Sequence, residues 1–276
     1  MVKRNLHAAS VDSFGDEWAR FDQRALGDSE ARKIFDEYFD VFPWELVGER
    51  SVGFDMGCGT GRWARFVAPK VGHLHCIDPS KALDVAMAAL SSHDNVSFHR
   101  CSVDEGALPQ GSQDFGYSLG VLHHLPDTFG GLRSCVELLK PGAPFLLYLY
   151  YAFDNRSLAF RLVWRASDLL RRAISRMPPR ARDVTTDIIA VMVYYPVARL
   201  CRWAEKRGLN VANVPLSYYR DHSLYTMRTD SRDRFGTPLE KRFTRREVQR
   251  MMEDAGLVDI RFSEHPPYWC AVGFRK

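Results

Sequence analysis

Short apolar runs alternate with helix-like segments through the first half of the chain. Each run has the length and composition of a buried strand, and most give way to apolar residues spaced three and four apart. The predicted strands are Val52–Met56, His73–Asp78, Val96–Cys101, Asp114–Val121 and Pro144–Tyr150. The helices between them begin near Arg62 and cover Ala82–Leu90 and Gly131–Leu139. This alternation predicts a doubly wound α/β domain with a parallel sheet.

Two helices are predicted ahead of the first strand. Ser13 is placed to cap the first of them, with Asp16 as its capping-box partner. The apolar face of this helix carries Phe14, Trp18 and Phe21. The second helix covers about Ser29–Phe39.

One helix and two strands are predicted at the end of the chain. Thr244 and Glu247 have capping-box spacing, and Gly256 stands just past the last helical residue. The strands Val258–Glu264 and Tyr268–Phe274 follow, joined by a turn that contains proline. Because their connection is so short, these two strands must run antiparallel.

Residues 155–242 interrupt the alternation and read first as helical and then as irregular. One helix has an apolar face of Ala159, Leu162, Val163, Ala166, Leu169, Leu170, Ala173 and Ile174, and another face of Arg161, Arg165, Arg171 and Arg172. A second helical stretch runs from about Asp187 to Arg207 and is interrupted near Pro196. Either the apolar face packs on the domain and the arginines are solvated, or the arginines form a basic surface for an anionic or membrane-associated substrate.

Composition agrees with an ordinary globular protein. The 276 residues are 46% hydrophobic and 26% charged, and a net charge of +4 does not by itself indicate nucleic-acid binding. The six cysteines form no metal-type pair, so we expect reduced, structural thiols and a cytoplasmic protein. The N-terminus lacks a signal peptide's apolar region. The longest apolar runs, Ala143–Phe153 and Ile188–Leu200, are shorter than the roughly 20 residues of a membrane-spanning helix.

The strongest chemical signal is the segment FDMGCGTG at residues 54–61, where the first strand turns into a helix. Glycines there permit a tight turn and a close approach to a ligand, and the helix start offers N–H groups to a carboxylate. Asp55 supplies an acceptor for an ammonium group. A carboxylate and an ammonium on one small ligand describe the methionine end of S-adenosylmethionine. A glycine-rich turn that serves strand geometry alone is the other interpretation.

Further polar positions follow the next two strands. Asp78 ends the second strand, where a carboxylate is able to accept from both hydroxyls of a ribose. Ser102, Val103 and Asp104 follow the third strand, near where an adenine would lie. A solvated strand-end carboxylate and an ordinary loop are the alternatives.

Together these motifs resemble the class I S-adenosylmethionine-dependent methyltransferase family, especially its branch that acts on small molecules. The matching pieces are FDMGCGTG, IDPS, VDEGALP, SLGVLHHLPD and LLKPGAPFLLYLY, within about Ser51–Tyr150. The resemblance implies a Rossmann-like seven-stranded sheet with an antiparallel last strand. It also implies S-adenosylmethionine as cofactor and S-adenosylhomocysteine as product. Gly53 departs from the branched residue usual in the first strand.

The motifs and the resemblance together give a set of expected cofactor contacts. They are Asp55, Gly57, Cys58, Gly59, Gly61, Asp78, Pro79, Ser102, Val103, Asp104 and Gly120. The N-terminal SFGDEWARF resembles a segment that covers the cofactor in some family members, which adds Trp18, although ordinary core packing is equally open. We therefore expect residues 1–50 over the cofactor site, a core of residues 51–154 and 243–276, and a mostly helical cap or lid at 155–242.

Two other functions stay open at this point. A dinucleotide-binding oxidoreductase is disfavoured, because Arg62 and Trp63 follow Gly61 where the fingerprint needs a small residue for close packing. A non-catalytic protein that binds S-adenosylmethionine is the other alternative.

Methyl transfer is an in-line displacement, so the protein chiefly aligns the acceptor. His123 and His124 follow the fourth strand at the carboxyl edge of the sheet, where an imidazole suits general-base work or orients the turn before Pro126. We expect no metal, because neither a Cys/His cluster nor a metal-type carboxylate group is visible.

The acceptor is expected to be a small molecule, with an anionic or lipid-linked compound among the candidates. Its predicted contacts are Tyr218, Tyr219, His222, Tyr225 and Arg228, which lie outside any clean helical period. No nucleic-acid partner is expected, because no RNA-binding module is evident. Weak contact with a membrane surface stays open.

Overall fold

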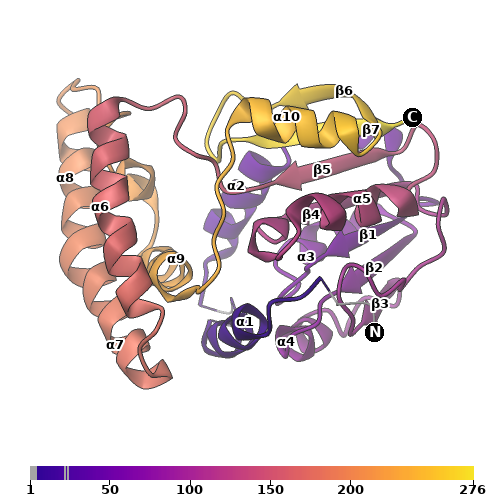
Figure 1. Ribbon diagram of the computed structural model, residues 1–276, viewed down its shortest axis with the longest axis horizontal. Coiled ribbons are helices and arrows are strands. Elements are labelled where there is room, and N and C mark those ends of the chain that lie inside the picture. The colour runs from indigo at the N-terminus through magenta and orange to yellow at the C-terminus, as the bar shows by residue number, and fades with distance from the viewer. Residues whose placement is uncertain (1–4, 22, 24) are drawn as a thin grey trace. The chain divides into compact units, whose positions relative to one another are not determined.

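The computed structural model describes residues 5–21, 23 and 25–276. Contacts within the chain divide it into two units. Residues 1–23, 31–152 and 239–276 form the first, here called the sheet unit, and residues 24–30 and 153–238 form the second, the helical unit. Figure 1 shows the strands of the one and the long helices of the other.

The sheet unit is built on seven strands in the order β3-β2-β1-β4-β5-β7-β6. They are β1 (Val52–Met56), β2 (His73–Ile77), β3 (Val96–His99), β4 (Phe115–Leu119), β5 (Pro144–Tyr148), β6 (Leu257–Phe262) and β7 (Cys270–Arg275). The first five pair in parallel, and β7 is antiparallel to both of its neighbours. The predicted seven-stranded sheet with its antiparallel last strand is therefore confirmed.

Side chains that alternate along each strand feed two separate cores. Phe54 and Met56 of β1 pack with α5 (Thr128–Leu138) and α10 (Arg245–Asp254). The opposite core contains residues of α2 (Asp28–Tyr38), α3 (Ala64–Val67) and α4 (Ala82–Ala89). Figure 1 shows α5 and α10 in front of the sheet and α2 behind it. With helices on both faces, the parallel strands are buried and their carboxyl ends meet at one edge.

The first helix begins earlier than the sequence suggested. Helix α1 covers Ala8–Arg20, so Ser13 lies buried inside it and is not its cap. The N–H groups of Ser10 and Val11 donate to the carbonyl oxygen of His7, which starts the helix one turn sooner. Ala8 and Ala9 favour helix strongly and lengthen it toward the N-terminus. The side chain of Asp16 lies outside the described residues.

The helix after β1 and the last strand also have other boundaries than the sequence predicted. The helix expected from Arg62 is a four-residue turn, α3, that continues as a 3₁₀ turn at Ala68–Lys70. Pro69 lacks the N–H that a longer α-helix needs. The last strand begins at Cys270 and not at Tyr268, because the proline turn occupies two more residues. The predicted capping box of α10 is confirmed, with Thr244 Oγ1 accepting from the N–H of Glu247 at 3.2 Å.

The helical unit contains α6 (Leu158–Ile174), α7 (Pro179–Ile189), α8 (Tyr195–Glu205) and α9 (Leu224–Gly236). A five-residue π-helical segment at Ala190–Tyr194 joins α7 to α8, so residues 179–205 form one continuous helix. The expected interruption near Pro196 is wrong, because the wider π turn accommodates the proline without breaking the helix.

Helix α9 lies where irregular structure was predicted. Ser223 caps it by accepting from the N–H of Thr226, and it carries Tyr225 and Arg228. Its buried face is largely polar, because Thr229, Ser231 and Arg232 are buried there beside Met227 and Phe235. A helix whose buried side is polar shows no apolar period, which explains why the pattern missed it.

The apolar face of α6 does not pack inside the helical unit. Leu162 and Leu169 are 64% and 66% exposed, whereas Arg171 is buried. The expectation of a packed apolar face is therefore wrong for this helix, whereas Arg165 and Arg172 are exposed, as the same interpretation expected. The 179–205 helix has a mean hydropathy of 1.3 over its most apolar 18 residues, so by length and composition it is able to cross a membrane. The expectation that no helix reaches that length is wrong.

Candidate active site

The glycine-rich turn after β1 has the tight geometry predicted for it. Gly57, Gly59 and Gly61 all have positive φ angles, of 81°, 54° and 76°. A Cβ at Gly57 would lie 2.5 Å from the Val121 side chain, and one at Gly61 would lie 2.9 Å from Leu90. Larger residues are therefore excluded both by conformation and by space. Cys58, between them, is a buried free thiol.

Asp55 is a buried carboxyl in the interior of this turn. Its side chain is 1% exposed, and neither carboxylate oxygen meets a donor in hydrogen-bonding geometry among the described residues. Burial raises the pKa of Asp55 well above its ordinary value, the Tyr117 hydroxyl opposes this rise, and the charge of Asp78 adds to it. A buried carboxylate without a partner is costly, so this position is suited to a ligand cation.

Asp78 connects the end of β2 to the glycine turn. One carboxylate oxygen accepts from the N–H of Gly59 at 2.9 Å. The other accepts from the N–H and the hydroxyl of Ser80 at 2.8 and 2.6 Å. Asp78 thus orders the turn whether or not it also contacts a ribose. Pro79, which lies between Asp78 and Ser80 in the sequence, is half-buried.

Helix α1 links the glycine turn to the histidine pair. The Nε1 atom of Trp18 lies 3.7 Å from the position of a Cβ at Gly59. Phe14, one turn earlier, contacts the ring of His124 edge-on with 4.8 Å between ring centroids. Residues four apart on a helix lie on the same face, so the glycine turn and His124 face the same side of α1.

The loop after β3 is tied to the N-terminal segment. Ser102 and Val103 are buried, and the Ser102 hydroxyl donates to Asp104 at 2.6 Å. The other oxygen of Asp104 accepts from the N–H of Asn5 at 2.7 Å. Asn5 also accepts from the N–H of Asp127, at 2.9 Å. Asn5 was not predicted as a site residue, because a lone asparagine near a terminus carries no pattern.

Gly120 follows β4 with a positive φ of 79°. A Cβ there would meet nothing within 4 Å, so this residue faces open space at the carboxyl edge of the sheet. Its N–H donates to the carbonyl of Tyr148 on the neighbouring strand β5, which fixes the backbone beside that space.

His123 and His124 are both buried in a 3₁₀ turn at Leu122–His124. The Nδ1 atom of His123 accepts from the N–H of Tyr150 at 3.4 Å, and its ring stacks on Tyr150 with 3.9 Å between centroids. Burial, with the charges of His124 and Arg242, lowers the pKa of His123 well below 6.5. His124 Nδ1 donates to the carbonyl of Leu239 at 2.6 Å.

These bonds give the two rings opposite tautomers. A neutral imidazole that accepts at Nδ1 carries its proton on Nε2, so His123 offers a donor there. A neutral imidazole that donates from Nδ1 carries its lone pair on Nε2, which is a buried atom in His124. The spacing of two adjacent histidines could not reveal this difference.

Residues 239–242, predicted as the end of the cap, return to the sheet unit beside this pair. The guanidinium of Arg242 lies 5.0 Å from the centre of the Tyr150 ring. Its Nε donates to Glu240 at 2.8 Å in an ion pair whose acidic side chain is 2% exposed. Sequence reasoning missed Tyr150, Arg242 and Glu240, because they are distant along the chain from the histidines.

The five predicted acceptor contacts lie within the helical unit. Tyr218 and His222 are neighbours, with 4.5 Å between their rings, and Tyr219 packs 5.1 Å from Tyr194. Arg228 forms a two-bond ion pair with Asp187 at 2.8 and 3.0 Å. Tyr225 lies in the first turn of α9. Their role toward an acceptor stays a prediction.

Within the described residues no group of three or more His, Cys, Asp or Glu side chains is arranged to hold a metal ion.

Known proteins resemble this chain in sequence over most of its length. A family model described as a methyltransferase domain matches residues 54–145. A ubiquinone biosynthesis O-methyltransferase of Aromatoleum aromaticum is 30% identical over 190 residues, covering 67% of this chain and 75% of that protein. A second protein of that name, from Xanthomonas euvesicatoria, is 26% identical over 192 residues, covering 67% of this chain and 74% of that protein.

The fold recurs in solved structures. A putative methyltransferase of Haloferax volcanii, solved in complex with a methyltransferase activator, superposes with a TM-score of 0.51 at 17% identity. The match covers 95% of this chain and 97% of that one, and it concerns the fold alone.

Proposed function

Since the chain belongs to the class I S-adenosylmethionine-dependent methyltransferases, we propose that it methylates an oxygen of a small-molecule acceptor of the ubiquinone-precursor class. S-Adenosylhomocysteine is the expected second product. The acceptor atom and class are suggested by relatives named as ubiquinone biosynthesis O-methyltransferases. The transfer of a methyl group to a small molecule follows from the family itself.

Asp55 is the observation that carries the cofactor assignment. Its wholly buried carboxyl has no cationic partner among the described residues, only the Tyr117 hydroxyl beside it, and lies next to a turn of three positive-φ glycines. An ammonium group would supply the missing countercharge, and the N–H groups of the turn suit a carboxylate. Asp78 and the Ser102–Asp104 loop stand where ribose and adenine contacts are expected, and Trp18 covers Gly59.

S-Adenosylmethionine supplies a methyl group on a positively charged sulfur, a good leaving group for in-line displacement. The chain's own contribution is to align the acceptor and to handle its proton. A hydroxyl acceptor loses its proton as the new carbon–oxygen bond forms. The lone pair on His124 Nε2 is the base we assign to that proton, and the Nε2–H of His123 is the donor that orients the acceptor oxygen.

The test measures binding and turnover separately. Calorimetry should give micromolar affinity for S-adenosylhomocysteine, abolished by Gly59→Val, because φ at Gly59 is positive. Radiolabelled S-adenosylmethionine should then label hydroxylated ubiquinone precursors, with the label on oxygen by mass spectrometry. Turnover only with amine or carbon acceptors would overturn the oxygen assignment. Binding without turnover on any acceptor would reduce the protein to a cofactor-binding role.

A further inference from the structure

The helical unit carries its apolar residues on the outside. Among the described residues, the large hydrophobic side chains that are exposed lie in this unit with only two exceptions, Leu46 and Met87. The same unit buries Arg171, Arg182 and Arg232. Isolated exposed apolar residues are normal, but a concentration of this kind on one unit indicates a surface that something covers.

This surface is formed by the outer faces of two helices. On α6 it includes Leu158, Leu162 and Leu169, and on the 179–205 helix it includes Ile188, Met192 and Leu200. Both helices contact α9 with their other faces. Figure 1 shows α6, α7 and α8 on the same side of α9, so their outward faces form one side of the unit.

The charge of these two helices is almost wholly positive. Residues 155–207 contain twelve Lys and Arg and four Asp and Glu. All four acids are neutralised by arginines, in the pairs Asp168–Arg171, Asp183–Arg232, Asp187–Arg228 and Glu205–Arg220, at 2.7 to 2.8 Å. Arg172 also pairs with Asp168, and Arg202 pairs with Asp221, but the two helices still carry many more basic than acidic residues.

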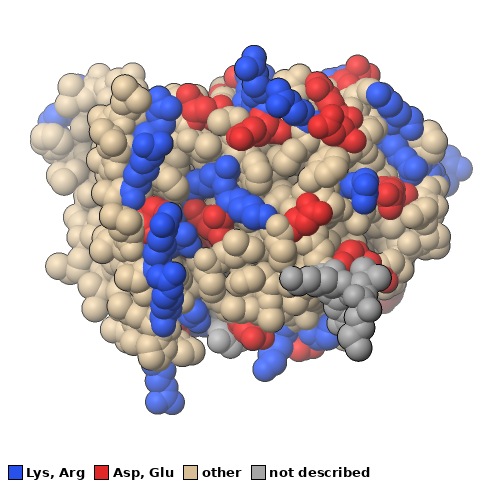
Figure 2. Space-filling view, in the orientation of Figure 1, with Lys and Arg blue, Asp and Glu red and all other residues tan. Residues whose placement is uncertain are grey.

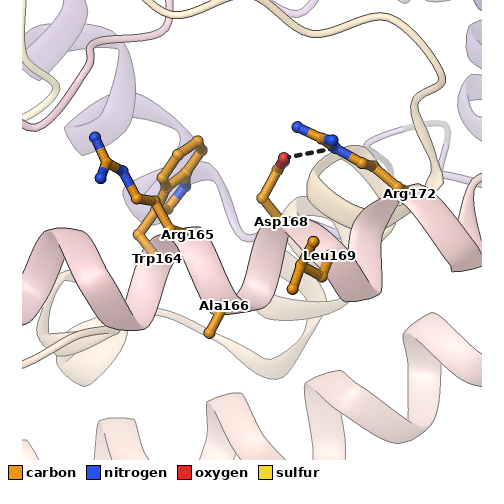
Figure 3. A pocket seen from close by; sticks show the side chains of 6 residues that line it. All are labelled: Trp164, Arg165, Ala166, Asp168, Leu169 and Arg172. Carbon is orange, nitrogen blue, oxygen red and sulfur yellow. Dashed lines mark hydrogen bonds and ion pairs between the residues drawn. The ribbon is translucent and has the colours of Figure 1, made fainter.

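Some of these arginines border the apolar face directly. Arg161, Arg165 and Arg172 recur at helical spacing along one edge of α6, and Figure 2 shows a column of basic side chains over this helix. Trp164, Arg165 and Arg172 line a surface depression of about 510 Å³. Figure 3 shows Arg172 bound to Asp168 at this place. Long arginine side chains suit such an edge, because their stems cover apolar groups while their heads remain at a polar boundary.

The 179–205 helix is suited to lie along a membrane surface and not to cross it. Its inner face carries Asp183 and Asp187, whose carboxylates are bound to arginines of α9, while its outer face is apolar. Insertion across a bilayer would force these ion pairs into hydrocarbon or break them. Lying in the interface keeps the polar face on protein and the apolar face in lipid.

We propose that the helical unit binds the surface of an anionic lipid bilayer through the outer faces of α6 and the 179–205 helix. The apolar side chains enter the boundary between headgroups and acyl chains, and Arg161 and Arg165 bind lipid phosphates. A second copy of this chain fits the surface less well, because a symmetric contact would bring two surfaces of the same positive charge together. The inference does not depend on the methyl acceptor.

Cosedimentation of the full chain with vesicles tests this proposal. Phosphatidylcholine vesicles with one third phosphatidylglycerol should bind the protein, and raising the salt should weaken binding. The double variant Arg161→Gln/Arg165→Gln should bind about 25-fold more weakly, roughly five-fold for each arginine. Leu162→Gln/Leu169→Gln should reduce binding by about tenfold or more.

Matched controls come from the sheet unit. Arg246→Gln/Arg250→Gln removes the same charge from the exposed face of α10, and Leu46→Gln/Met87→Gln polarises the two other exposed apolar residues. Both controls should bind vesicles within about twofold of the wild type. Calorimetry with S-adenosylhomocysteine checks that every variant is folded, and a variant that loses this binding relative to the wild type is excluded from the vesicle comparison.

Three outcomes would overturn the proposal. The first is a wild-type protein that remains in the supernatant with anionic vesicles. The second is a loss of binding that is equal in the α6 variants and in the controls, which would indicate a non-specific charge effect. The third is a concentration-dependent dimer, seen by sedimentation and lost in Leu162→Gln/Leu169→Gln, without vesicle binding. That result would assign the surface to a second copy.

Discussion

Phe115 on β4 fills the space that a side chain at Gly53 on β1 would need. A Cβ at Gly53 would lie 2.3 Å from Cε1 of the Phe115 ring, and the two residues are direct partners in the parallel pairing. The next pair reverses the arrangement, because a Cβ at Gly116 would lie 2.3 Å from the ring of Phe54. Each glycine therefore accommodates a phenylalanine of the opposite strand.

Gly53→Ala should destabilise the sheet unit although alanine favours most structures over glycine. The added methyl group has no room beside a fully buried ring, and overpacking of this kind costs about 1–3 kcal/mol. Chemical denaturation measures the loss. In a Phe115→Leu background the same substitution should cost less, and Gly48→Ala, where a Cβ meets nothing within 4 Å, is the neutral control. Additive losses in the double variant would disprove the steric explanation.

The pair of Gly53 and Phe115 shows what sequence patterns predict and what they miss. The alternation of strands and helices predicted the sheet correctly, because burial on both faces leaves continuous apolar runs. Gly53 looked like a weak point in its strand, since nothing local indicates that a ring from β4 will occupy its space. Contacts between residues distant along the chain have no signature in either segment alone.

The candidate site was likewise predictable from the sequence only in part. The glycine turn and Asp55 were recognisable, because close approach to a ligand restricts both residue type and spacing. The hydrogen bonds that set the tautomers of His123 and His124 come from Tyr150 and Leu239, in other parts of the chain. Helix α9 was missed for a related reason, since its buried face pairs Arg232 with Asp183 and presents no apolar period.

Cofactor affinity should rise with pH through the titration of Asp55. Burial raises the pKa of this carboxyl in the free protein, and a bound ammonium favours its ionised form. Binding at a pH below the raised pKa therefore releases a proton and is weaker, and it reaches a plateau above that pKa. Calorimetry of S-adenosylhomocysteine binding in buffers of different ionisation enthalpy measures the proton directly. The absence of proton release at every pH would disprove this coupling.

Asp55→Asn should separate stability from binding. A carboxyl whose pKa is raised above its ordinary 3.8 on folding stabilises the folded state fully at a pH below 3.8. Its contribution is lost as pH rises through the folded-state pKa. The variant should therefore melt higher than the wild type at pH 8 without cofactor, by a margin that shrinks toward pH 4. It should bind S-adenosylhomocysteine more weakly at pH 8.

Asp78→Ala should lower cofactor affinity by about ten- to a hundredfold, as expected for charged hydrogen bonds worth roughly 1.5–3 kcal/mol. The structure adds a second cause, because the same carboxylate holds the N–H of Gly59. The 2′-deoxy analogue of S-adenosylhomocysteine distinguishes the two. If Asp78 binds the ribose, wild type loses affinity for the analogue and the variant loses little more. If the wild type and the variant lose the same affinity for the analogue, Asp78 does not contact the ribose and only holds the glycine turn.

The two histidines should respond differently to substitutions that imitate one ring nitrogen each. The amide nitrogen of asparagine stands near the Nδ1 position, and the end of glutamine stands near Nε2. His124→Asn keeps a donor to the Leu239 carbonyl but lacks the Nε2 lone pair. It should reduce kcat by about 10²–10⁴-fold, the usual contribution of a general base, with little change in S-adenosylhomocysteine affinity.

His123→Gln keeps a donor at the Nε2 position and should retain activity within about tenfold, whereas His123→Ala should lose more. The pH profile provides an independent check, because His123 has a pKa well below 6.5 and stays neutral across the neutral range. An activity rise near neutrality should therefore not arise from His123. It should persist in His123→Gln. The reverse pattern would exchange the two roles, and a loss of cofactor binding in either variant would show that these side chains support the turn and not the proton transfer.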